Sequence, residues 1–174
     1  MPALIAILGL ILAAGVWAWR LRMAKQALDD VSGIAGDVIA AARRLGFRRR
    51  MNAHPVESIE EPSLAISALG LAFLDLASLP TAEQLKSLKQ AVRKELAVSE
   101  IKTDEMLIVS RWLVNECKTP QMAIGRLGKR LAQLDRTGFQ PLLAVLGGME
   151  GGTDTLSPRQ RDALDEIARI FRLN

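Results

Sequence analysis

The sequence predicts an all-α protein, in which an N-terminal transmembrane helix and a helical stalk precede a compact bundle of about six helices. Three observations predict this fold class. An uncharged apolar run opens the chain, apolar residues then recur three and four positions apart, and helix-capping signals follow one another without a convincing strand pattern. We expect four regions: an anchor at residues 1–20, a basic stalk at 21–50, a linker at 51–62 and a helical domain at 63–174.

The opening run, residues 2–19 (PALIAILGLILAAGVWAW), contains no charged side chain. As an α-helix with a rise of about 1.5 Å per residue it extends roughly 27 Å, close to the roughly 30 Å of bilayer hydrocarbon. Basic residues follow it on one side only, at Arg20, Arg22 and Lys25. The positive-inside rule then predicts a single-pass membrane protein with its C-terminal domain in the cytoplasm.

A cleaved secretory signal is the alternative interpretation of this run. No Lys or Arg precedes it, and Trp17 and Trp19 stand where a cleavage site needs small residues. The two tryptophans suit the aromatic belt at a membrane interface. The sequence therefore favours an anchor.

The stalk begins with apolar residues spaced alternately three and four apart between Leu21 and Leu45, which places them on one narrow helical seam. Gly33 and Gly36 lower its helix propensity by about 1 kcal/mol each relative to alanine. The stalk is therefore solvated, lies against the membrane or the domain, or associates weakly with a second copy.

A second basic cluster follows at Arg43, Arg44, Arg48, Arg49 and Arg50. Such clusters next to a membrane span attract anionic lipid by about 1 kcal/mol per charge. Together with the three basic residues after the anchor, these arginines are the candidate lipid-surface residues. The alternative is an ordinary solvated charge run that enforces the topology.

The charge is unevenly distributed along the chain. Residues 1–50 hold eight Lys or Arg against three Asp or Glu, whereas residues 51–174 hold fifteen against sixteen. The basic character belongs to the part next to the predicted anchor, so we expect the lipid bilayer and no nucleic acid as a partner.

The first helices of the domain follow a linker with two prolines and three glutamates. Ser63 is the expected N-cap of a helix at 64–79, which is apolar on nearly every face and so belongs at the centre of the core. Thr81 and Gln84 form a capping box for the next helix, with Leu85, Leu88, Val92 and Leu96 facing inward.

The remaining helices are predicted by their caps. Thr103 starts a helix that ends near Cys117, and Thr119 caps one that begins with a proline. A short apolar helix spans 139–149, closed by Gly151-Gly152, and Ser157 with Gln160 caps the last helix.

Catalytic and redox chemistry find little support in the residue types. The single cysteine, Cys117, lies in an apolar-periodic stretch and is expected to be buried, and the single histidine, His54, lies in the linker. No nucleophile and base pair, phosphate-cradling loop or cofactor motif is recognisable. We therefore expect no enzyme and no cofactor.

Capping boxes open at Thr81 and at Ser157, 76 residues apart, which indicates two related halves of the domain. The alternative is coincidence, since capping boxes are common. The tail LGGMEGGTDTLSPRQ, continued by Leu164, Ile167 and Phe171, and the earlier segment AFLDLASLPTAE resemble the tellurite-resistance TerB-like family. That family includes the membrane-anchored N-terminal region of the DjlA co-chaperone. The resemblance covers about residues 63–174 and implies two related helical halves in a protein of the bacterial inner membrane.

Family members often carry acidic residues in both loops, where a divalent-cation site has been suggested. This chain has Ala77-Ser78-Leu79 and Glu150-Gly151-Gly152 there, with Gln160 where the family favours an acid. The remaining candidate metal ligands are Glu150, Asp154, Asp75 and Glu83. Hard cations need about six or more converging oxygen ligands, so we expect no metal and a capping or solubility role for these acids.

The function expected is that of a membrane-anchored, non-enzymatic interaction module that docks an unidentified protein, as the resemblance implies for envelope or stress-related complexes. The candidate docking residues are Trp112, Met106, Met122 and Phe139, unless each simply fills the core. The alternative function is divalent-cation or ligand sensing through Glu150 and Asp154.

Overall fold

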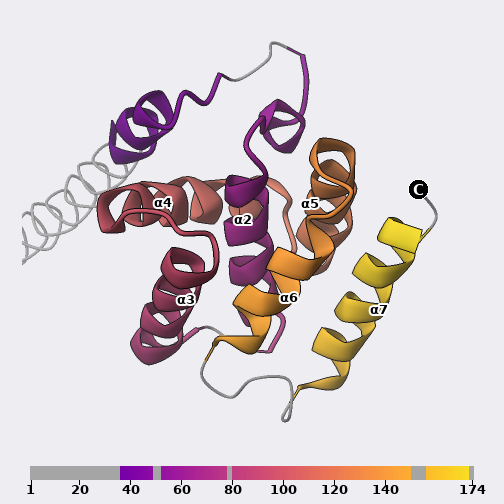
Figure 1. Ribbon diagram of the computed structural model, residues 1–174. Helices are drawn as coiled ribbons and strands as arrows, with labels where there is room; N and C mark the ends of the chain where they lie inside the picture. The colour runs from indigo at the N-terminus through magenta and orange to yellow at the C-terminus, as the bar shows by residue number, and fades with distance from the viewer. Residues whose placement is uncertain (1–35, 49–51, 78–79, 150–155, 173–174) are drawn as a thin grey trace, which may run out of the picture. The chain divides into compact units, whose positions relative to one another are not determined.

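Six α-helices and one 3-10 helix make up the folded part of a computed structural model that describes residues 36–48, 52–77, 80–149 and 156–172 (Figure 1). They are η1 (Pro55–Ser58), α2 (Pro62–Asp75), α3 (Ala82–Glu95), α4 (Glu100–Glu116), α5 (Pro120–Leu134), α6 (Phe139–Gly147) and α7 (Pro158–Arg172). Residues 36–44 are also helical. The predicted all-α class is confirmed for the described residues, as a compact domain of about seven helices.

Two compact units divide the chain, one at residues 1–39 and the other at residues 40–174. The predicted membrane span and most of the predicted stalk lie outside the described residues. Among the helices that are described, none has both the length and the apolar character needed to cross a bilayer.

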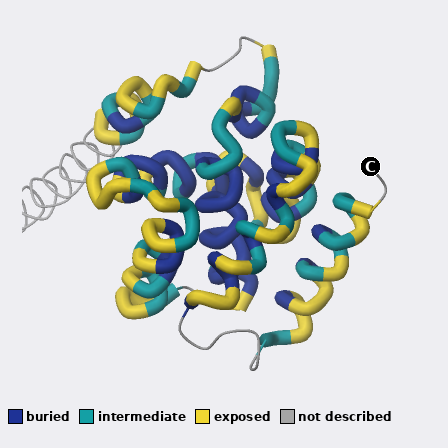
Figure 2. Tube along the Cα trace, viewed as in Figure 1, coloured by how far each residue is buried: buried dark blue, intermediate teal, exposed yellow. Residues whose placement is uncertain are grey.

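Helix α2 is the centre of the second unit, as its uniformly apolar sequence predicted. Every residue from Leu64 to Leu74 is buried, and α2 packs most extensively against α4 and α5 (Figures 1 and 2). Helix α3 approaches it closely at Gly70, where an added Cβ atom would stand 2.7 Å from Leu88 Cδ1. A small residue at this position therefore lets α2 and α3 pack.

The start of α2 differs from the prediction. Its N-cap is Glu61, Pro62 occupies the first turn, and the Ser63 hydroxyl is buried without a hydrogen-bond partner among the described residues. Proline suits the first helical position because it needs no N–H partner there, and it holds the preceding residue in an extended conformation. The proline, rather than the serine, sets this boundary.

Three other predicted N-termini are confirmed. The Thr81 hydroxyl accepts a hydrogen bond from the Gln84 N–H (3.2 Å), and the Gln84 side chain accepts one from the Thr81 N–H (3.0 Å). Ser157 and Gln160 make the same reciprocal pair, at 3.3 and 3.0 Å. Thr119 caps α5 ahead of its proline.

Helix α4 begins earlier than predicted. Ser99 is its N-cap, and Thr103 lies one turn inside the helix, where its buried hydroxyl donates to the Ser99 carbonyl at 2.8 Å. Helix α3 ends with Ala97 in the left-handed region (φ 52°) and the Val98 N–H bonded to the Arg93 carbonyl. This Schellman-type turn delivers an extended Ser99 directly to the start of α4.

The segment expected to be a linker contributes to the core. Val56 and Ile59 are fully buried, and the Arg130 guanidinium of α5 donates to the Ile59 carbonyl from Nε (2.8 Å). His54 caps η1, because its Nδ1 accepts from the Val56 N–H. Composition alone did not predict this packing, because a segment with two prolines and three glutamates is typical of a linker, although it also contains the core residues Val56 and Ile59.

Candidate functional site

Residues 41–48, which we call the clasp, carry the described part of the second basic cluster. Their helix ends at Gly46 (φ 69°), with the Gly46 N–H bonded to the Arg43 carbonyl (3.1 Å) and the Phe47 N–H bonded to the Ala42 carbonyl (2.8 Å). These two bonds define a Schellman motif, which glycine favours because it adopts a positive φ without steric cost. The motif folds Phe47 back along the helix.

The clasp packs on α4. Ala41 is fully buried, and the Phe47 ring meets Trp112 edge to face, with centroids 5.8 Å apart and planes at 86°. The Arg44 guanidinium forms an ion pair with Glu105, whose side chain is only 12% exposed. Because a carboxylate taken out of water requires a counter-charge, Arg44 allows Glu105 to lie at this contact.

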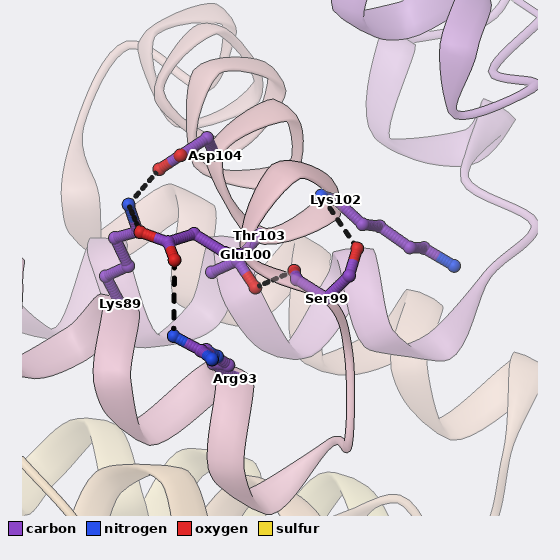
Figure 3. A network of polar contacts seen from close by, with 7 residues as sticks. All are labelled: Lys89, Arg93, Ser99, Glu100, Lys102, Thr103 and Asp104. Carbon is purple, nitrogen blue, oxygen red and sulfur yellow. Dashed lines mark hydrogen bonds and ion pairs between the residues drawn. The ribbon is translucent and has the colours of Figure 1, made fainter.

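A polar network joins α3 to the start of α4 (Figure 3). The Lys89 ammonium lies 2.7 Å from an Asp104 carboxylate oxygen and 3.3 Å from one of Glu100, and Arg93 reaches Glu100 at 3.4 Å. The hydrogen bond to Asp104 raises the pKa of Lys89. All four side chains are solvent-accessible, so the network links α3 to α4 with only a modest contribution to stability.

Exposed apolar side chains lie on α4 and α5. Ile101 is 74% exposed and Ile108 is 38% exposed, and their spacing of seven residues places both on one side of α4. Met122 on α5 is 55% exposed. The sequence does not mark the two isoleucines as exposed, because heptad spacing of apolar residues in a helix normally indicates the buried side.

The four predicted docking residues have different environments. Met106 is fully buried in the core, and Trp112 contacts Phe47. Phe139 packs against Phe171 of α7, with ring centroids 5.4 Å apart, while Met122 is exposed. Met106 therefore fills the core, which was the alternative to a docking role. No contact among the described residues joins Met106, Trp112, Met122 and Phe139.

The candidate metal ligands are not brought together in the described part of the chain. Asp75 is held by Arg111, whose Nη1 lies 3.0 and 2.7 Å from the two carboxylate oxygens. Glu83 is exposed in the first turn of α3. Glu150 and Asp154 lie outside the described residues. Among residues 36–48, 52–77, 80–149 and 156–172, no three His, Cys, Asp or Glu side chains form a group that could hold a metal ion.

Only some of the candidate lipid-surface residues lie in the described part of the chain. Arg43, Arg44 and Arg48 are exposed in the clasp. The other five lie outside the described residues: Arg20, Arg22, Lys25, Arg49 and Arg50.

The single cysteine and the single histidine both have structural environments. Cys117 is buried at the end of α4, and burial raises the pKa of its thiol, which disfavours the reactive thiolate. The two ring nitrogens of His54 contact main-chain atoms, Nδ1 the Val56 N–H (3.3 Å) and Nε2 the Glu116 carbonyl (3.2 Å). The tautomer with the proton on Nε2 satisfies both contacts.

Comparisons with protein-family models, curated proteins and solved structures give no match to this chain. A function can therefore be proposed only from the sequence and from the contacts described above.

Proposed function

We propose that this chain is a membrane-anchored, non-enzymatic helical interaction module of the TerB-like type, with its domain on the cytoplasmic side of the bacterial inner membrane. The anchor rests on the uncharged run at residues 2–19 and the basic residues that follow it. The TerB-like type rests on the resemblance at both ends of the domain, where the two capping boxes are formed.

The observation that carries the interaction role is the exposed pair Ile101 and Ile108. Both project from α4, a helix whose remaining apolar residues are buried or partly buried. These two side chains are available to an apolar surface of a protein partner.

Site-specific photocrosslinking in cells that produce the full chain tests this role. A photoreactive residue at Ile101 or Ile108 should give a discrete protein adduct, whereas one at Asp162, an exposed position on α7, should not. Equal adducts from all three positions, or none from the two isoleucines, would contradict a docking surface on α4.

The membrane topology is tested separately. A protease-cleavable tag placed after Asn174 should be protected in intact spheroplasts and cleaved only after lysis. Cleavage in intact spheroplasts would place the domain outside the cytoplasm and overturn the positive-inside argument.

The alternative, cation sensing through Glu150 and Asp154, is tested by titrating calcium, magnesium and zinc separately while the melting temperature is followed. A ligand that binds only the folded state raises that temperature by mass action. We expect no change, since two carboxylates fall well short of the about six or more oxygen ligands that a hard cation needs. A saturable rise would favour sensing.

A further inference from the structure

We propose that Arg43 and Arg48 of the clasp bind an anionic membrane surface, and that the attachment of the clasp to α4 makes this contact a property of the whole bundle. The inference rests on the proposed membrane anchoring and deepens it, because it names a second membrane contact and the residues that make it.

Positive charge is concentrated in the sequence at residues 43–50, without acidic residues among them. Five of the eight residues at positions 43–50 are arginine and none is acidic, whereas residues 51–174 are nearly balanced. Guanidinium groups bind phosphate oxygens through paired hydrogen bonds, which suits the phosphates of lipid headgroups.

The structure assigns different roles to these arginines. Arg44 neutralises the largely buried Glu105, so it serves the fold. Arg43 and Arg48 are exposed, and neither forms an ion pair with a described residue. These two side chains are therefore available to an external anion.

The clasp is mounted on the bundle rather than trailing from it. The buried Ala41, the Schellman motif at Gly46 and the contact between Phe47 and Trp112 fix the backbone that carries Arg43 and Arg48. An anion bound by these arginines consequently positions α4 and the helices packed on it. A mobile basic tail would not have this effect.

A lipid surface is the occupant favoured by the sequence context. The cluster begins 24 residues after Trp19, the last residue of the uncharged run, so the chain that carries the predicted anchor also presents these arginines on the side predicted to be cytoplasmic, where the leaflet is anionic. A phosphate-rich nucleic acid is the competing class, and it is included in the test.

The experiment uses the full chain in nanodiscs of phosphatidylcholine alone or with about 30% phosphatidylglycerol, a composition that supplies a negative surface potential. A fluorophore is attached through Asn52→Cys, an exposed position near the clasp, while the native Cys117 is buried. A quencher carried on a lipid headgroup reports how close the clasp lies to the membrane.

We expect at least about twofold stronger quenching in the anionic nanodiscs, reversed by 0.5 M salt because exposed charges are then screened. The pair Arg43→Gln and Arg48→Gln should reduce the extra quenching seen in the anionic nanodiscs, because it removes the two exposed arginines of the clasp that form no ion pair with a described residue. The matched pair Arg159→Gln and Arg161→Gln, which removes the same charge from exposed positions on α7, should leave it unchanged.

The failure of this inference differs from the failure of the proposed anchor. Full chain that remains in the aqueous fraction without entering nanodiscs contradicts the anchor. Chain that enters the nanodiscs but shows equal, salt-insensitive quenching in both lipids overturns the clasp contact alone. Tighter binding to a single-stranded oligonucleotide than to anionic nanodiscs, lost in the Arg43 and Arg48 variant, overturns the choice of a lipid surface.

Discussion

Polar side chains around α2 tie its neighbours to it, although α2 itself is almost entirely apolar. The hydroxyl of Ser110 in α4 lies 3.1 Å from that of Ser67, and the buried side-chain amide of Gln160 donates to the Phe73 carbonyl at 3.1 Å. Arg111 reaches Asp75 at the end of the same helix. Each contact satisfies a group whose burial would otherwise cost stability.

The pair of Asp75 and Arg111 gives a test at the residue scale. Asp75 is 13% exposed and Arg111 is 38% exposed, so solvent screens the pair only in part. We expect Asp75→Asn to lower the free energy of unfolding by about 1–2 kcal/mol, measured by urea denaturation. Asp162→Asn, at an exposed position on α7, should change it by less than about 0.5 kcal/mol. Equal effects would remove the special role of Asp75.

Cys117 gives a test of burial. Because burial raises the pKa of the native thiol, the unfolded chain loses this proton first as the pH rises. The contribution of Cys117 to stability is therefore present below the ordinary thiol pKa of about 8.5 and lost as the pH rises through the higher native pKa. Cys117→Ala should flatten the fall in unfolding free energy between pH 8 and pH 10.

The same thiol provides a kinetic measurement. Alkylation of native Cys117 at pH 8 should be at least about 100-fold slower than in concentrated urea, since the reagent reaches a buried thiol only through an opening of the structure. Comparable rates would show that the thiol is accessible.

Helix boundaries at the element scale depend on competition between neighbouring cap candidates. Thr81, Thr119 and Ser157 each form the predicted cap. Ser63 and Thr103 stand beside a stronger competitor. Pro62 occupies the first turn of α2, so Glu61 rather than Ser63 is the N-cap. The turn that ends α3 makes Ser99 rather than Thr103 the N-cap of α4.

Ser99 and Ser63 therefore make a matched comparison. Ser99→Ala removes the hydroxyl that accepts the Lys102 N–H at 3.3 Å and should destabilise the domain by about 1 kcal/mol. Ser63→Ala removes a buried hydroxyl without a described partner and should be neutral or stabilising. Thermal and urea unfolding of both variants measure this difference, and a reversed order would restore Ser63 as the cap.

The whole second unit extends beyond the helices that the sequence assigned to the domain. It begins at Ala40 and includes the clasp and η1, so residues placed in the stalk and linker by composition contribute buried side chains. The edge-to-face pair of Phe47 and Trp112 is the aromatic contact that attaches the clasp to α4.

A double-mutant cycle tests that attachment. Phe47→Leu and Trp112→Leu, made singly and together, should show a coupling free energy of about 0.5–1.5 kcal/mol, the range for aromatic pairs. The pair Phe47→Leu and Phe139→Leu should be additive, because Phe139 packs against Phe171 instead. A coupling free energy of zero in the first cycle would show that the contact between Phe47 and Trp112 does not attach the clasp to the domain.

The all-α class and the central place of α2 followed from local patterns. Three- and four-residue spacing selects the buried side of a helix, and a helix without a polar side must lie inside the core, as Leu64 to Leu74 do. The confirmed capping residues and Pro120 likewise fixed their boundaries, since these contacts involve residues only a few positions apart.

The candidate site required contacts that the sequence does not encode locally. Arg44 and Glu105 are 61 positions apart, and Asp75 and Arg111 are 36 apart, so only the packing of helices brings each acid to its base. The same packing places Asp75, a candidate metal ligand, in an ion pair with Arg111 and leaves Ile101 exposed. Local hydrogen bonding and periodicity determined which segments are helices, whereas tertiary packing decided which charged and apolar side chains are left for a partner.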